Sequence, residues 1–454
     1  MIERLRSSLA ASPWPLTIVA LLALQLGPLP LKAAAVLMLV LIAWAHPTML
    51  VCLVPATAPF ALIPVALTAT AAIPIHEFVF AIACIGWAIS TLQRRSLDFT
   101  PRRSDLWGAL IAIAAAVSIV WALPEGRSEA LRTFRWVIIE PMLWFVLIRS
   151  SMQRDRTVLT TLVHSMVVSA AVVAGLGILQ FVGVDLVPWF GSKRVFADNV
   201  VATGNIRRVA SVYGHANNLG LFLERVLPLA LLCILWPVVL IRGRWLWVGV
   251  IALGIVLSFS RGAWLATLIA AAVIAIYHYG ADAMRRRPWL LIAILAAGII
   301  GTTATLLTRG ASAGSVDARI LLWQEALRWI ELRPLGLGLG QFYFYHNPEY
   351  GHSIIAPALV GSSEQYAAHP HNLLLDAWLN LGPIGLVALL GVVLTALRNA
   401  LGTQSPVHTV VIAILLSTVV HGLVDQFFFV TDLAFCFWLV VFLGQVDTVH
   451  STQL

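Results

Sequence analysis

Charged side chains are scarce in this chain. Asp, Glu, Lys and Arg make up 11% of its 454 residues, whereas soluble domains carry about 25%. Hydrophobic residues account for 60% of the sequence. These proportions exclude an ordinary soluble domain and predict a protein that lies largely within a membrane.

Cysteine is nearly absent as well. Its four copies lie inside apolar runs and share no paired spacing: Cys52, Cys84, Cys233 and Cys436. Isolated cysteines in such runs act as small hydrophobic side chains. The sequence therefore argues against a disulfide framework and against a cysteine zinc site.

Signals for nucleotides and nucleic acids are missing too. The net charge of +8 comes from arginines in short loops, without the basic and aromatic stripe of a nucleic-acid-binding surface. Gly336, Gly338 and Gly340 follow no predicted strand, so we expect the chain to re-enter the membrane there rather than to form a phosphate loop. We expect no nucleic-acid partner.

What the sequence does contain is a long series of apolar runs. Most are long enough to cross about 30 Å of hydrocarbon, and because lipid satisfies no backbone hydrogen bonds, they must be helical. The runs lie at residues 14–28, 31–46, 49–71, 76–92, 106–122, 131–148, 158–182, 212–240, 244–259, 262–280, 289–308, 371–397, 407–424 and 427–445. The first two are short and can form one broken hairpin. We therefore predict an all-α polytopic membrane protein with 12–14 transmembrane helices.

Arginine clusters set the orientation of these runs. Alternate loops hold the basic residues: Arg94, Arg95, Arg102 and Arg103; then Arg149, Arg154 and Arg156; then Arg242 and Arg244; then Arg285, Arg286 and Arg287; then Arg398. The positive-inside rule assigns such loops to the cytoplasm. We therefore expect cytoplasmic termini, and we expect residues 183–211, 258–262 and 309–370 on the periplasmic side.

The loop at 309–370 is the one large segment predicted outside the membrane, and loops of this length are usually functional or disordered. An apolar stripe recurs in it at helical spacing: Val316, Ile320, Trp323, Leu327 and Ile330. The stripe predicts a short amphipathic helix. Such a helix lies flat on the membrane or packs on the helix bundle, and the sequence leaves both arrangements open.

The chain accordingly divides into four parts. Residues 1–150 form N-terminal transmembrane helices, and residues 151–308 form transmembrane helices that carry two arginine motifs. Residues 309–370 form the large periplasmic loop with its short amphipathic helices. Residues 371–454 form C-terminal transmembrane helices that open with a histidine motif.

Arg208 stands at the outer entry to a long apolar run, directly after Arg207. A guanidinium binds phosphate oxygens through two parallel hydrogen bonds. The alternative is an interfacial arginine that extends toward lipid headgroups, but His215 and Asn217 follow closely and favour a dedicated polar pocket. Which of the two arginines enters that pocket stays open.

Arg261 interrupts two apolar runs with almost no loop, in the sequence Ser260-Arg261-Gly262. An ionisable residue at a membrane junction is costly and marks a functional site by default. The positive-inside rule also disfavours arginine on this side. The alternative is an arginine that pairs with a carboxylate and holds the bundle together.

His371 opens the run after the long loop, in the sequence His369-Pro370-His371. With an ordinary pKa of about 6.5, an imidazole accepts a proton near neutral pH. His346 and His352 lie upstream, but no spacing among these histidines matches a zinc signature. We predict a base at His371 and no metal site.

These segments occur together, in order, in a known family. The stretch from Arg208 to Asn217, the stretch from Ser260 to Leu265, and His371 followed by ten residues and Gly382 resemble the O-antigen ligase and O-antigen polymerase superfamily of membrane glycosyltransferases. The ten-residue spacing to Gly382 selects His371 rather than His369.

Two further details belong to this resemblance. The stretch from Asp317 through Arg319 to Gly338 is similar to part of the large periplasmic loop of these proteins. The chain departs from the family pattern at Ala216, where a proline is usual.

The resemblance implies a GT-C-like membrane protein that transfers a glycan from undecaprenyl diphosphate without metal, nucleotide sugar or other cofactor. His371 would be the catalytic base, and Arg208 and Arg261 would bind the donor diphosphate. The supporting residues would be Arg207, His215, Asn217, Arg319 and His369. These residue types suit the chemistry, because an acceptor hydroxyl needs a base and a leaving diphosphate gathers negative charge.

The sequence does not identify the acceptor of the glycan. Ligases transfer the glycan to lipid A-core or another glycolipid, and polymerases transfer it to a second lipid-linked repeat. We expect a ligase, with a polymerase as the alternative, in the bacterial inner membrane with the active site facing the periplasm among membrane lipids. A transporter or flippase for lipid-linked glycans would also use the arginines, but it needs no base at His371.

Overall fold

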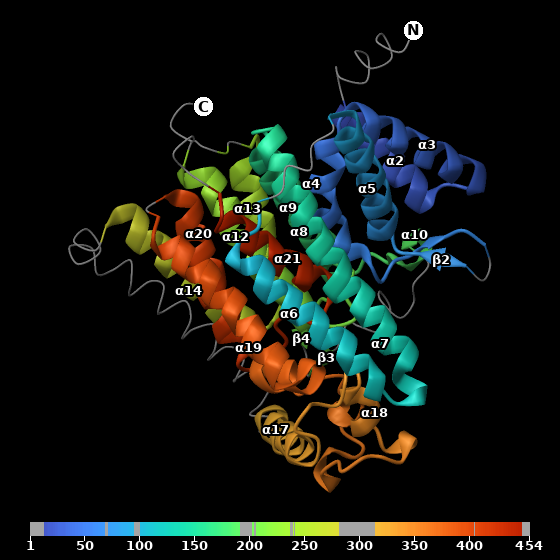
Figure 1. Ribbon diagram of the computed structural model, residues 1–454, viewed down its shortest axis with the longest axis vertical. Helices are drawn as coiled ribbons and strands as arrows, with labels where there is room; N and C mark the ends of the chain where they lie inside the picture. The colour runs from blue at the N-terminus through green and yellow to red at the C-terminus, as the bar shows by residue number, and fades with distance from the viewer. Residues whose placement is uncertain are drawn as a thin grey trace. The chain divides into compact units, whose positions relative to one another are not determined.

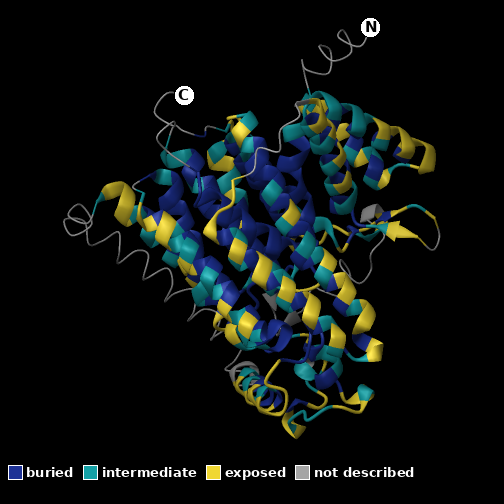
Figure 2. Ribbon diagram, in the orientation of Figure 1, coloured by how far each residue is buried: buried dark blue, intermediate teal, exposed yellow. Residues whose placement is uncertain are grey.

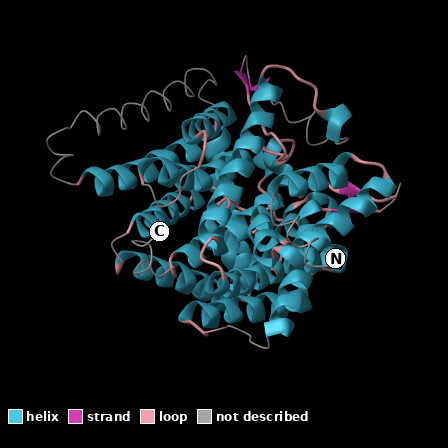
Figure 3. Cartoon of the chain, turned by 90° about the horizontal axis from the view of Figure 1, so that it is seen from above, coloured by secondary structure: helices cyan, strands magenta, loops and turns pink. Residues whose placement is uncertain are grey.

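The computed structural model describes residues 13–68, 71–94, 100–190, 202–203, 206–236, 239, 241–280, 314–403 and 405–446. Helices dominate these residues, and the strands are very short (Figure 3). The prediction of an all-α membrane protein is thereby confirmed. The apolar run predicted at 289–308 lies outside the described residues.

Among the described residues, six helices are long and apolar enough to cross a membrane. They are α5 (Ile75–Arg94), α6 (Arg103–Ser118), α9 (Val158–Phe181), α12 (Ala216–Leu235), α14 (Arg261–Tyr279) and α19 (Leu373–Leu401). The shorter apolar helices are α2 (Pro13–Leu26), α3 (Leu29–Ala45), α4 (Pro47–Thr57), α13 (Arg244–Ser258), α20 (Pro406–Gly422) and α21 (Thr431–Leu443). The total of 12–14 spans, like the division into four parts, stays a prediction.

One compact unit comprises residues 1–100, 143–203 and 207–260. Within it α2 packs on α3, α4 packs on α5 and α9, and α13 packs on α9 and α12. Gly254 allows α13 to approach α9 closely, because a Cβ at this position would lie 2.7 Å from the Cβ of Ala174 on α9. The short elements of this part are η1 (Ala58–Phe60), β1 (Val65–Ala66), β2 (Ala72–Ile73), α10 (Val187–Phe190) and β3 (Ala202–Thr203), with β1 antiparallel to β2; β4 (Ile206–Arg207) follows at the unit boundary.

The second unit comprises residues 101–142, 204–206 and 261–454. In it α14 packs along α20, α19 packs along α6 and α20, and α21 packs on α20 (Figure 1). After α6 the chain runs through η2 (Ile119–Trp121), η3 (Pro124–Gly126), α7 (Arg127–Thr133), a π-helical stretch η4 (Phe134–Ile139) and α8 (Glu140–Arg154), which continues into the first unit.

The described part of the long loop folds into its own small core beyond the start of α19 (Figure 1). It contains α17 (Gly314–Leu332), α18 (Phe342–His346), η5 (Pro348–Tyr350), η6 (Pro357–Leu359) and η7 (Ser363–Tyr366). The predicted amphipathic helix is therefore present as α17, which carries a buried and an exposed face (Figure 2).

The predicted apolar stripe of α17 does not form the face that packs on the loop core, however. The buried face consists of Ala318, Leu322, Ala326 and Trp329. Ile320 and Leu327 of the predicted stripe are 43% and 51% exposed. The helix has apolar residues on two faces, and small alanines make the close contacts. The prediction from helical spacing selected the face with the larger apolar side chains.

A break in α19 binds the long loop to this helix. Pro383 has no N–H, so it cannot donate to the Leu379 carbonyl four residues earlier. That carbonyl instead accepts hydrogen bonds from the N–H groups of Leu337 and Gly338, at 2.8 and 3.1 Å. Gly382, with φ 69° and ψ −178°, makes the turn at the break. Main-chain hydrogen bonds thus hold the loop against α19.

Replacing Gly382 by alanine is expected to destabilise the protein by about 1–3 kcal/mol, the usual cost of a strained backbone conformation. A Cβ there would also lie 2.7 Å from the Leu335 carbonyl oxygen. Thermal unfolding in detergent measures the effect. Gly249→Ala is the matched control, because a Cβ at this helical glycine meets nothing within 4 Å. Equal melting temperatures for the two variants would contradict this account of the break.

Candidate active site

Two hydrogen bonds hold Arg208 within the first unit. Its Nε donates to the Ser258 carbonyl oxygen at 3.1 Å, and a terminal nitrogen donates to Asn217 Oδ1 at 2.9 Å. Asn217 lies in the first turn of α12, and Ser258 ends α13. Arg208, at the start of the first motif segment, therefore contacts the end of α13, which directly precedes the second motif segment at Ser260. The side chain of Arg207 lies outside the described residues.

The chain between Arg208 and α12 is fixed by a contact from α9 and by its own helix cap. Buried Gln180 accepts a hydrogen bond from the Ser211 N–H at 2.8 Å and donates one to the Ser211 carbonyl at 3.1 Å. His215 caps α12, because its Nδ1 accepts from the Asn217 N–H at 3.2 Å. Gln180 was not predicted, since a glutamine within an apolar run belongs to no motif.

Arg261 begins α14 directly after the turn that ends α13. In that turn Phe259 has a left-handed backbone, with φ 49°. Gly262 packs against the imidazole of His421 on α20, so closely that any Cβ would overlap the ring. Arg261 therefore lies at the same end of the α14–α20 pair as His421.

His371 lies between two carboxylates just before α19. Its Nδ1 is 3.2 Å from Asp425 Oδ1, and its Nε2 is 3.4 Å from Glu364 Oε2. The His371 side chain is 15% exposed, and that of Asp425 is 3% exposed. The Trp323 indole donates to the His371 carbonyl oxygen at 3.3 Å. The imidazole is thus oriented through both ring nitrogens, and its backbone is held separately.

Asp425, in the loop between α20 and α21, is the central carboxylate of this cluster. Its Oδ2 lies 3.4 Å from the Arg319 guanidinium, and its Oδ1 accepts from the Gln426 N–H at 2.8 Å. Burial opposes its charge, but the hydrogen bond and the charge of His371 outweigh burial and hold the pKa of Asp425 well below its usual range. Asp425 therefore carries a negative charge beside the imidazole.

The pKa of His371 differs from the ordinary value assumed from the sequence. Burial alone would lower this pKa, because it disfavours the charged ring. The hydrogen bonds and charges of Asp425 and Glu364 outweigh burial and raise the pKa to about 9. At neutral pH His371 is therefore an imidazolium in this arrangement.

A buried pair positions Glu364. His346 Nδ1 lies 3.0 Å from the Glu325 carboxylate, and both side chains are buried. The other ring nitrogen of His346 lies 2.7 Å from the Glu364 carbonyl oxygen. The pair thus links α17 and α18 to η7, the short helix whose carboxylate meets His371. His346 has a structural role here.

Three atoms of this cluster are close enough to surround a cation. The ligand atoms of His369, His371 and Asp425 lie within 4.8 Å of one another. Each already has a partner: His369 Nδ1 accepts from the His371 N–H at 3.3 Å, and His371 Nδ1 and Arg319 share Asp425. The guanidinium adds positive charge that opposes a metal ion.

A residue with strained backbone lies within or directly before each of the three motif segments. Among the described residues other than glycine, Ser211, Phe259 and His371 alone have positive φ, at 53°, 49° and 52°. Such residues cost about 1–3 kcal/mol each and cluster at active sites. The strain supports the three segments as parts of a functional site.

The second unit therefore brings together Arg319, His369 and His371 of the predicted residues. Asp425 and Glu364 complete the cluster, and sequence reasoning missed both. Arg208, His215 and Asn217 form a separate contact group within the first unit. That all the predicted residues share one site stays a prediction.

Comparison with known proteins agrees with the motifs. A family model described as O-antigen ligase matches residues 246–390. The match begins in α13, contains Arg261 and His371, and ends within α19. The comparison with curated proteins gives no match. The family indicates membrane glycan transfer of the O-antigen ligase or polymerase type.

Proposed function

We propose that this chain, which carries an O-antigen ligase domain over residues 246–390, transfers a glycan from undecaprenyl diphosphate to lipid A-core at the periplasmic face of a bacterial inner membrane. The observation that carries the proposal is the contact between His371 and buried Asp425, 3.2 Å apart, at the start of α19. A transporter for lipid-linked glycans has no need of an imidazole anchored in this way.

The proposed mechanism starts from the orientation of the ring. The Asp425 carboxylate accepts a hydrogen bond from the Nδ1–H group and leaves Nε2 for the acceptor hydroxyl, as in other carboxylate–histidine pairs. The acceptor oxygen forms a bond to the anomeric carbon of the donor while its proton passes to Nε2. The bond from that carbon to the diphosphate breaks, and the diphosphate leaves with the electron pair.

The arginines stabilise the leaving group in this proposal. Negative charge on the diphosphate grows as the bond breaks, and guanidinium groups in a partly dry site stabilise that charge. Arg261 begins α14 at the end of the helix pair where His421 lies. Arg208 is held by Asn217 and by the end of α13.

Glu364 occupies the position in which the acceptor hydroxyl would meet Nε2. Its side chain is 29% exposed, in contrast to the buried Asp425. We infer that the acceptor displaces Glu364, which lowers the pKa of His371 and frees the base only when the acceptor is present. The Asp425 contact persists throughout.

Glu364→Gln is expected to shift the pH dependence of kcat/KM toward lower pH. In the wild type, with a His371 pKa of about 9, roughly 1% of the ring is neutral at pH 7, so kcat/KM should rise about tenfold per unit up to that pKa. Removing one carboxylate removes one cause of the raised pKa. Glu349→Gln, a change at an exposed glutamate of the same loop, should leave the profile unchanged. An unshifted profile for Glu364→Gln would contradict the displacement model.

The same raised pKa has a consequence for stability. The charged imidazolium stabilises the folded state fully below the ordinary pKa of 6.5, and this contribution is lost as the pH rises through about 9. Activity and stability should therefore change in opposite directions over this range.

The decisive experiment incubates the purified protein with a lipid-diphosphate glycan and lipid A-core, and analyses the products by gel and mass spectrometry. Joined product supports the ligase. A parallel reaction contains donor alone, and chain lengthening there would assign a polymerase instead. Movement of donor across a vesicle membrane without any new glycosidic bond would overturn glycan transfer.

The same reaction tests the proposal that no metal is needed. Mg²⁺ is usually held by carboxylate groups, but the two carboxylates of this cluster already pair with His371, and Asp425 also pairs with Arg319. Activity should persist in EDTA. Loss in EDTA and recovery with a divalent ion would instead assign a metal to the cluster of His369, His371 and Asp425.

A further inference from the structure

The second unit contains a polar cavity at the far ends of α19 and α20 from His371. Its volume is about 490 Å³, within the usual range of about 300–1,000 Å³ for ligand pockets. The lining residues come from the starts of α6 and α20 and the ends of α19 and α21: Pro101, Arg102, Arg103, Ser104, Thr395, Asn399, Thr403, His408, Gly444, Gln445 and Val446. None of these eleven residues is acidic.

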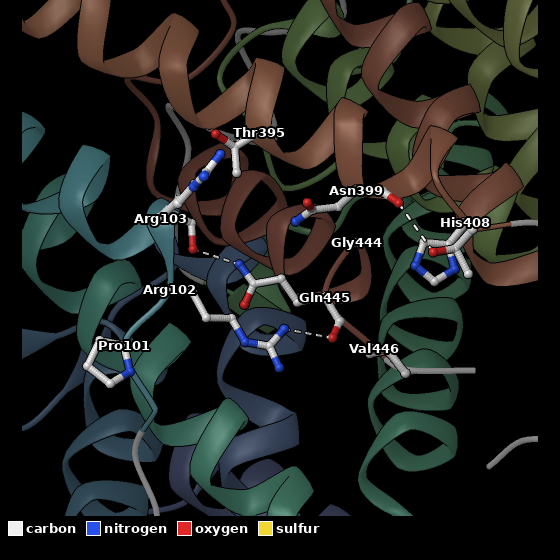
Figure 4. Close-up of a pocket in the computed structure, with 11 residues that line it drawn as sticks. Pro101, Arg102, Arg103, Thr395, Asn399, His408, Gly444, Gln445 and Val446 are labelled. Atoms are coloured by element: carbon white, nitrogen blue, oxygen red, sulfur yellow. Dashed lines mark hydrogen bonds between the residues drawn. The ribbon is translucent and has the colours of Figure 1, made fainter. Parts of the chain in front are cut away.

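The cavity favours a negatively charged ligand. Arg102 and Arg103 line it (Figure 4). Helices α6 and α20 also begin there, and the N-terminal end of each helix carries partial positive charge. Arg102 uses one guanidinium nitrogen to donate to the Gln445 carbonyl oxygen at 2.9 Å, and within the described part of the chain most of its five donors remain for a ligand. Asp105, the nearest acid in sequence, accepts from the Arg102 backbone N–H at 2.7 Å.

Gln445 provides an independent sign of a ligand. The residue is 8% exposed, and its side chain lies between Arg102 and Arg103 (Figure 4). The amide nitrogen donates to Ser104 Oγ at 2.7 Å, whereas Oε1 has no hydrogen-bond partner among the described residues. Rotating the side-chain amide by 180° exchanges Oε1 and Nε2, so one of the two atoms is still left without a partner. A buried amide atom without a partner is costly, so it calls for a ligand with a complementary polar group.

The surroundings favour a lipid over a soluble anion. Leu106 on α6 is 71% exposed, and Leu394 and Leu401 on α19 are 63% and 64% exposed. Each of these leucines lies within two residues of a residue that lines the cavity, and the two helices pack against each other. A ligand with acyl chains would cover them while its headgroup enters the cavity.

We propose that this cavity binds the headgroup of phosphatidylglycerol, a phospholipid that combines an anionic phosphate with hydroxyl groups. The phosphate lies against Arg102 and Arg103 and the starts of α6 and α20. The headgroup glycerol pairs with the Gln445 amide. The site is separate from the proposed catalytic cluster, and it does not depend on the proposed reaction.

Native mass spectrometry of the full-length protein released from nanodiscs tests the proposal. Nanodiscs contain equal amounts of phosphatidylglycerol and phosphatidylcholine with the same acyl chains, and we expect one phosphatidylglycerol to be retained preferentially. Arg103→Ala should reduce its retention about fivefold, since each basic residue near the surface contributes that much to binding an anionic lipid. Gln445→Glu should reduce it further, because it places a carboxylate beside the phosphate.

Arg398→Glu is the matched control. It reverses a charge at an exposed position near the end of α19, outside the residues that line the cavity. Retention should persist in this variant. Equal retention of the two lipids, or equal loss in the control, would overturn the proposal. Thermal stability provides a second measurement: phosphatidylglycerol should raise the melting temperature of the wild type but not of Arg103→Ala. If inorganic phosphate matches the lipid in this measurement, the site takes a soluble anion and the proposal is wrong.

Discussion

Replacing His371 by alanine is expected to lower the rate of glycan transfer by about 10²–10⁴-fold, the usual contribution of a positioned acid or base. Donor binding should change little, because a base acts mainly in the transition state. The comparison requires both a single-turnover transfer assay and a direct measurement of lipid-diphosphate binding in detergent.

His369→Ala is the matched control for this variant. It removes the neighbouring imidazole, whose ring centroid lies 4.3 Å from that of His371, and leaves the contact between His371 and Asp425 in place. We expect a much smaller loss of rate. Near-normal transfer by His371→Ala would show that the base is assigned wrongly, and His369 and His215 would be the next candidates.

Loss of either arginine that we propose to bind the donor should have the second largest effect. Arg208→Ala and Arg261→Ala are each expected to reduce turnover about 10²–10³-fold, the cost of removing one group that stabilises developing charge. Donor binding should weaken as well, since the diphosphate is already charged in the ground state. Lysine at either position should restore activity only partly, because it lacks the planar pair of donors.

Arg328→Ala separates this effect from a general loss of positive charge. Arg328 is exposed on α17, so its removal should leave transfer unchanged. Full rescue by Arg261→Lys would show that a point charge suffices and would contradict bidentate binding. An Arg261→Ala enzyme with unchanged donor affinity and turnover would instead favour an arginine that only holds the bundle together.

The sequence predicted the helices and the motif residues because both have local signals. An apolar run must be helical in lipid wherever it occurs, and Arg261 is conspicuous because charge is rare at such a junction. The face of α17 was not predictable in the same way. Its packing depends on Ala318 and Ala326, which fit against the loop core, and spacing gives small residues little weight.

Asp425 and Glu364 could not be found by their spacing. Asp425 stands 54 residues after His371, and only the packing of α20 against α19 and α14 returns the chain to the histidine. The raised pKa of His371 could not be predicted for the same reason, because two carboxylates that belong to no motif raise it. Gln180 has no motif and acts only through its contact with the strained Ser211.

The 54 residues between His371 and Asp425 also set an order of assembly during synthesis. At about 5–20 residues per second, the ribosome needs roughly 3 to 11 seconds to make the chain from the histidine to its carboxylate partner. All three arginine and histidine motifs exist before that interval begins. During it α19 and α20 must insert into the membrane before the loop that follows them can reach the imidazole. The nascent chain therefore contains Arg208, Arg261 and His371 for some seconds before Asp425 is made, and the loop between α20 and α21 completes the cluster.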